Sequence, residues 1–203
     1  MKSKLDLKEK LTLTIQIILD AKELMNDSYK MLMVDSSEKF SLIKRNKFLN
    51  RVRTSFWKLA IIELTKLYGS SMDHFRLDEL INEMIVNYCS AEWATNISTD
   101  ELKILQDYLN SDEIKVRTEK LRNMRNQHYA HTDKAPKNNI HDIKFYFLDF
   151  AFLLRNAELI VEELMSKIFD SQKIFLPYEG EDVDMFLNSY IELRKLKALS
   201  KLK

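Results

Sequence analysis

Glycine and proline are scarce in this chain of 203 residues, which contains only two of each. Average usage would give several times more. Phosphate-binding loops of the G-x-G-x-x-G and G-x-x-x-x-G-K-[ST] types, and the G-x-S-x-G nucleophile elbow, need closely spaced glycines. Gly69 and Gly180 are too far apart to form any of them. Because hairpin-rich β-folds also use glycine in their turns, we expect an all-α fold.

Cysteine and net charge exclude further classes of protein. The single cysteine, Cys89, cannot form an internal disulfide or a cysteine-cluster zinc site. We expect it to be a buried, small apolar residue in a reducing cytoplasm. Thirty-two basic residues against 31 acidic ones give a net charge of +1, so no global field attracts polyanions. The N-terminus lacks the apolar region of a signal peptide, and the apolar stretch 145–154 is too short to span a membrane.

Apolar residues recur at helical spacing along most of the chain. They predict helices over about 11–34, 35–68, 77–88, 98–129, 140–169 and 182–199, with a possible interruption of the fourth near residues 110–111. In the second helix the apolar stripe consists of Phe48, Val52, Phe56, Leu59 and Ile62, which we expect in the core. The sequence therefore predicts one all-α domain over residues 1–203, an antiparallel bundle with an additional C-terminal helix.

Two overlapping Arg-Asn…His pairs lie where the fourth helix should end. Arg122 precedes His128, and Arg125 precedes His131, with Asn following each arginine. Taken by themselves, these residues have a structural explanation, because cations near a helix C-terminus are favourable by about 0.3–1 kcal/mol. A metal site is a second alternative, with His128 and His131 assisted by Asp133 or His141. It lacks the usual H-E-x-x-H or Glu-x-x-His pattern.

The helix before this motif carries five basic residues and Glu119 within a short stretch: Lys115, Arg117, Lys120, Arg122 and Arg125. This could be a local stripe that binds phosphate groups. The alternative is a solvated helix face in which Arg122 pairs with Glu119. The C-terminal segment from Arg194 to Lys203 is also basic and amphipathic, and either solvation or contact with RNA or a membrane would explain it.

The segment from Arg125 to Asp133, Arg-Asn-Gln-His-Tyr-Ala-His-Thr-Asp, resembles the Arg-polar…His motif of the HEPN superfamily. Its Ala-His-x-Asp ending is similar to the branch of abortive-infection AbiU-type proteins. Residues 61–68, followed by a polar loop and residues 77–81, also resemble that branch. The helix order fits from about Leu11 to Leu199, and only the Arg-Asn…His core is specific.

The resemblance implies a small all-α bundle that forms a homodimer. Active members of the superfamily are metal-independent endoribonucleases of toxin–antitoxin or phage-defence systems, with RNA as substrate and in some cases a cognate antitoxin protein as partner. No cofactor or metal is implied. Other members bind nucleotides or partner proteins and have lost activity, so a catalytically inactive binding module is the alternative. A helical interaction protein with an accidental motif is a third hypothesis.

The residue types suit metal-free RNA cleavage by the 2′-hydroxyl. His131 can act as general acid or base, because histidine titrates near neutral pH. Arg125 can donate two hydrogen bonds to phosphate oxygens. Asn126 would orient the catalytic site, and Arg122, His128 and Tyr129 would contact substrate.

The spacing of this motif raises a geometric problem. Six residues of continuous helix leave two side chains about 120° apart. Arg125 and His131 therefore converge only if the helix breaks near Ala130–His131 or if a second copy of the chain completes the site. We expect both.

Overall fold

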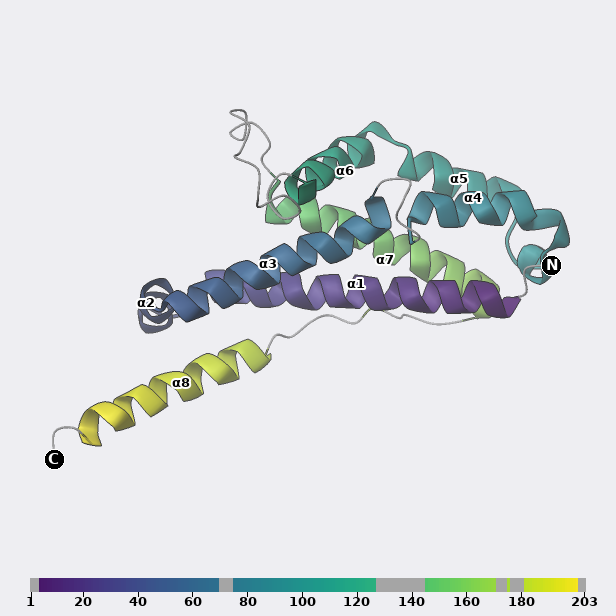
Figure 1. Ribbon diagram of the computed structural model, residues 1–203. Helices are drawn as coiled ribbons and strands as arrows, with labels where there is room; N and C mark the ends of the chain where they lie inside the picture. Colours follow the sequence, from purple (N-terminus) through teal and green to yellow (C-terminus); the bar gives the residue numbers. More distant parts are fainter. Residues whose placement is uncertain (1–3, 70–74, 127–144, 171–174, 176–180, 201–203) are drawn as a thin grey trace. The chain divides into compact units, whose positions relative to one another are not determined.

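The computed structural model describes residues 4–69, 75–126, 145–170, 175 and 181–200. These residues form helices, turns and short connections, and no described residue belongs to a β-strand. The helices are α1 (Lys4–Leu32), α2 (Ser37–Arg45), α3 (Lys47–Tyr68), α4 (Leu77–Asn87), η1 (Tyr88–Ser90), η2 (Glu92–Thr95), α5 (Thr99–Leu109), α6 (Asp112–Met124), α7 (Phe147–Phe169) and α8 (Glu181–Ser200). The expected all-α class is confirmed (Figure 1).

The chain divides into two compact units. Unit 1 comprises residues 1–21 and 61–176, and unit 2 comprises residues 22–60 and 177–203. Two long helices, α1 and α3, each contribute one part to unit 1 and the other part to unit 2. The expectation of a single domain over residues 1–203 therefore stays a prediction, and each unit is described by itself.

Unit 1 is a bundle in which α7 supplies a long apolar surface. Along α7 the buried side chains recur every three or four residues, from Phe150 through Leu153, Ala157 and Val161 to Ile168. This spacing keeps them on one broad stripe of the helix. The helix pairs α4–α5 and α6–α7 pack side by side in this unit (Figure 1). Burial of these apolar side chains, at roughly 25 cal/mol per Å², is the main stabilising contribution.

Polar contacts fix the position of α7 within unit 1. The buried hydroxyl of Tyr68 donates a hydrogen bond of 2.8 Å to the carbonyl oxygen of Leu153. Burial, with a smaller effect of Tyr108, raises the pKa of Tyr68, so this hydroxyl remains a donor. The hydroxyl of Tyr108 in α5 donates to Oδ1 of the buried Asn156. Buried polar groups are stabilising only when they are hydrogen-bonded in this way, so these contacts select one register of α7.

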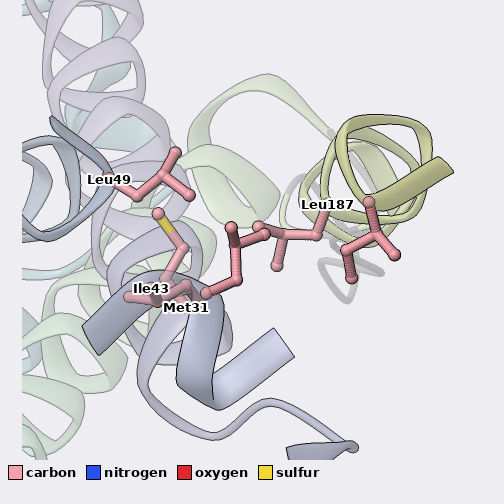
Figure 2. Packing of buried hydrophobic residues seen from close by; sticks show 6 residues of the cluster. Met31, Ile43, Leu49 and Leu187 are labelled. Carbon is pink, nitrogen blue, oxygen red and sulfur yellow. The ribbon is translucent and has the colours of Figure 1, made fainter. Parts of the chain in front are cut away.

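Unit 2 has its own apolar cluster. Its buried members are Met31, Leu42, Ile43, Leu49, Leu187 and Ile191. Figure 2 shows these side chains converging from the end of α1, from α2, from the start of α3 and from α8. Leu187 is completely buried. The C-terminal helix α8 is therefore held in unit 2 by core packing.

A buried lysine also connects α2 to α8 in unit 2. Nζ of Lys39, whose side chain is only 6% exposed, lies 3.1 Å from Oδ1 of Asp35 and 3.1 Å from Oδ1 of Asp184. Burial alone would lower the pKa of Lys39, but the hydrogen bonds to Asp35 and Asp184 outweigh it and raise the pKa. The same contacts, with Lys30, lower the pKa of Asp184. The lysine thus stays charged inside the packed unit.

Several expected helix boundaries are confirmed. α4 and α8 match their expected ranges to within one residue, and the expected interruption near residues 110–111 separates α5 from α6. α5 begins with a capping box, in which Glu101 N donates to the Ser98 hydroxyl at 3.2 Å and Ser98 N donates to the Glu101 carboxylate at 2.7 Å. This reciprocal pairing satisfies donors that the helix itself leaves open.

Two expected helices are corrected. The helix expected over 35–68 breaks at Asn46, which has extended backbone angles (φ −91°, ψ 104°) between α2 and α3. Oδ1 of Asn46 accepts from the backbone N–H groups of Phe48 and Leu49 at 3.0 and 3.4 Å, so it caps the start of α3. Of the helix expected over 140–169, the first five residues lie outside the described residues. α7 begins at Phe147, because Tyr146 is extended and its N–H donates to Asp149.

The expected core stripe of the second helix is only partly correct: Val52 and Phe56 are partly buried and pack against the apolar cluster of unit 2, but two other members of the stripe are exposed. Phe48 is 66% exposed and Leu59 is 46% exposed, whereas Leu49, Ala60 and Ile61 are buried. Small residues such as Ala60 allow close packing that a pattern of large apolar residues does not reveal. Cys89, expected to be buried, is exposed.

Candidate functional site

The candidate site begins at the C-terminal end of α6. This helix buries Ile114, Thr118 and Leu121 on one face. Asp112 and Glu113 occupy its first turn, where negative side chains stabilise the helix by interacting with the positive end of its dipole. Regular α-helix ends at Met124, and Arg125 and Asn126 continue it as a wider π-type turn. Such turns are frequent at functional sites.

Arg125 and Asn126 are brought into direct contact at this end. Nη1 of Arg125 donates a hydrogen bond of 3.1 Å to Oδ1 of Asn126. Arg125 is half-buried and Asn126 is exposed. Within the described part of the chain, Arg125 forms no ion pair with a carboxylate. The guanidinium is therefore oriented by a neutral neighbour, and no described carboxylate competes with an anionic ligand for it.

Arg122 has a different environment, facing the C-terminal end of α3. Its Nε donates to the carbonyl oxygen of Tyr68 at 2.7 Å, and its Nη2 donates to the carbonyl oxygen of Gly69 at 2.5 Å. The last carbonyls of a helix lack intrahelical donors, so this guanidinium caps α3. We expected Arg122 to contact the substrate, and only the N–H groups that do not bind these carbonyls remain for that contact. The alternative pairing with Glu119 is replaced by these carbonyl contacts.

Two of the five basic residues of the α6 stripe, Arg117 and Lys120, pack on α7. Arg117 Nε lies 3.5 Å from Asp149 Oδ1. Cζ of the same arginine lies 4.1 Å from the centre of the Phe152 ring, a cation–π contact. Lys120 Nζ lies 3.7 Å from Asp149 Oδ1. Of the five basic residues, Arg117, Lys120 and Arg122 thus stabilise unit 1, which leaves Lys115 and Arg125 for a ligand.

A pocket of about 560 Å³ lies beside α6. Its lining includes Lys115, Thr118 and Arg122 from α6, together with Arg76 and Leu77 at the start of α4. The hydroxyl of Thr118 is buried and has no hydrogen-bond partner within the described residues. Four other helical threonines donate to the carbonyl four residues earlier: Thr12, Thr14, Thr54 and Thr65. No pattern in the sequence indicates this pocket, because α3, α4 and α6 meet only in the folded chain.

The other expected site residues, His128, Tyr129 and His131, lie outside the described residues, as do Asp133 and His141 of the metal alternative. The expected convergence of Arg125 and His131 therefore stays a prediction. Across the described ranges, no group of three or more His, Cys, Asp or Glu side chains is placed to hold a metal ion. No helix within those ranges is long and apolar enough to cross a membrane.

Comparison with protein-family models, with curated proteins and with solved structures finds no match to this chain.

Proposed function

We propose that this protein is a HEPN-like, metal-independent endoribonuclease of a phage-defence or toxin–antitoxin system. The observation that carries the proposal is the arrangement of Arg125 and Asn126, the first two residues of the motif. They lie at the point where α6 stops being a regular helix, and Arg125 has no carboxylate partner within the described chain. An oriented, uncompensated guanidinium suits a phosphodiester whose charge increases in the transition state.

In this proposal each motif residue has one role. Arg125 binds the phosphate, and Asn126 holds its guanidinium in place. His131 transfers a proton between the 2′-hydroxyl, the leaving oxygen and solvent. His128 and Tyr129 contact the substrate. The active form is a homodimer, in which a second copy of the motif completes the site, and a cognate antitoxin would act by covering it.

Cleavage of mixed RNA in EDTA tests this proposal. We expect the wild type to cleave and Arg125→Ala and His131→Ala each to lose at least about 100-fold in rate, the lower range for positioned proton transfer. Arg125→Lys keeps the charge but loses the two-pronged donor, so it should retain partial activity. His74→Ala is the matched histidine control and should cleave normally. Equal cleavage by the wild type and His131→Ala, with folding verified by circular dichroism, would refute the proposal.

A catalytically inactive nucleotide-binding module is the second candidate, and the pocket beside α6 favours it. Its volume of about 560 Å³ lies within the usual range for small-molecule sites. Lys115 supplies a cation at its wall, and Arg122 keeps only the N–H groups that do not cap α3. Saturable binding of a nucleotide by a wild type that cleaves no RNA would support this function over the nuclease.

A further inference from the structure

Unit 2 contains a groove that the motif does not explain. It has a volume of about 780 Å³ and lies between α8 and the junction of α2 with α3. The floor is formed by Leu42, Tyr190 and Ile191, of which Leu42 and Ile191 are buried. Asn46 Nδ2 donates to the Tyr190 hydroxyl at 3.2 Å, which fixes the aromatic ring at the junction.

The rim of this groove is strongly cationic. Arg45 and Lys47 flank Asn46 on one side, and Arg194 and Lys195 lie on α8 on the other. Glu38 is the acidic residue of the lining, and it pairs with Lys195 at 3.2 Å. Arg45, Lys47 and Arg194 have no ion-pair partner within the described part of the chain. A chain with a net charge of +1 thus places three uncompensated cations around one groove.

The combination of floor and rim matches the chemistry of a nucleic-acid strand. Cations on opposite walls bind successive phosphates of a backbone, and an aromatic floor accepts bases by stacking. Tyr190 itself stacks on Phe186, with ring centres 6.1 Å apart and planes at 24°, so an aromatic surface continues along α8. An acidic peptide would use the cations but not this floor.

We propose that the groove of unit 2 is a binding site for the phosphate backbone of single-stranded nucleic acid, separate from the Arg-Asn…His motif. That the strand is RNA rests on the proposed nuclease function. The phosphate-binding role rests on the groove itself and does not depend on that function. The groove would hold a substrate strand independently of its base sequence, since contacts with phosphates position a strand without distinguishing one base from another.

The test measures binding separately from cleavage. Every protein carries Arg125→Ala, and binding of a fluorescein-labelled oligouridylate is followed by anisotropy in EDTA at several salt concentrations. We expect Arg45→Gln with Arg194→Gln to weaken binding about tenfold. Loss of two phosphate contacts should also reduce the salt slope by about 1.4.

The matched control is Lys44→Gln with Lys197→Gln, which removes the same charge from the same two helices outside the groove lining. It should weaken binding by less than about threefold, because only unspecific attraction is lost. The proposed role of the groove would be overturned if both double variants weakened oligouridylate binding equally, or if neither weakened it. Competition by polyglutamate as strong as by unlabelled oligouridylate, or preferential binding to phosphatidylserine vesicles, would also overturn it.

The two proposals fail separately in this design. A wild type that binds RNA through the groove but never cleaves it would refute only the nuclease. A protein with Arg45→Gln and Arg194→Gln that cleaves RNA normally and binds it with unchanged affinity would refute only the groove.

Discussion

At the scale of single residues, neighbouring arginines of one motif have different environments. Arg122 satisfies the carbonyls of Tyr68 and Gly69, whereas Arg125 contacts only the side chain of Asn126 among the interactions described. Sequence spacing could identify both arginines as members of one motif but could not separate them. The distinction depends on where α3 ends relative to α6, which is a property of the folded chain.

This difference predicts effects of different size on stability for substitutions of Arg122 and Arg125. Arg122→Gln should lower the free energy of unfolding by about 2 kcal/mol, because two charge-assisted hydrogen bonds to helix-end carbonyls are lost. Arg125→Ala should change it by less than about 0.5 kcal/mol, the usual range for surface positions. Urea denaturation followed by circular dichroism measures both. If Arg122→Gln were as stable as the wild type, the capping role of Arg122 would be wrong.

At the scale of helices, the sequence predicted most of the described elements, and the failures have physical causes. The start of α5 was predictable because its capping box, Ser98 to Glu101, is entirely local. The break at Asn46 was missed because asparagine within an apolar-periodic stretch is a weak signal, and its capping bonds to Phe48 and Leu49 form only once the chain turns. In the α3 stripe, Val52 and Phe56 do pack against the apolar cluster of unit 2, whereas Phe48 and Leu59 are exposed. The two exposed residues were misassigned because burial depends on which neighbours pack against the helix.

The capping box of α5 predicts a pH dependence of stability. The ion pair with Lys167, followed by the hydrogen bonds with Ser98, lowers the pKa of Glu101 from 4.5 to about 2. A carboxyl whose pKa is lower in the folded state stabilises the fold above its unfolded pKa and loses that contribution as the pH falls toward its folded pKa. The contribution of Glu101 should therefore be complete above about pH 4.5 and disappear progressively toward pH 2.

Denaturation at a series of pH values tests this dependence. Between pH 4.5 and 2, the free energy of unfolding of the wild type should fall more steeply than that of Glu101→Gln, which cannot ionise. Asp100→Asn removes the adjacent exposed carboxylate but leaves the contacts of Glu101 with Ser98 and Lys167 intact, so it should follow the wild-type curve. Parallel curves for the wild type and Glu101→Gln would contradict the role of the ion pair.

At the scale of the whole molecule, the sequence predicts one domain, whereas the contacts of the folded chain form two units. The prediction depended on the chain length of 203 residues and on the absence of a segment long enough to be a domain linker. Such a linker is not needed here, because α1 and α3 are continuous helices that contribute to both units. The candidate nuclease motif belongs to unit 1 and the cationic groove to unit 2. If the two units are stable independently of each other, a substitution in the core of unit 2 should impair strand binding without impairing cleavage.

Leu187→Ala measures that independence, because Leu187 is completely buried in the apolar cluster of unit 2. Truncation of a buried leucine costs about 2–5 kcal/mol. If each unit is stabilised by its own core, amide hydrogen exchange should accelerate in α2, in α8 and in the ends of α1 and α3 that belong to unit 2, while α5, α6 and α7 keep their protection. The variant should then lose strand binding in the groove and retain RNA cleavage. Uniform acceleration in both units would instead show one cooperative domain, as the sequence predicts.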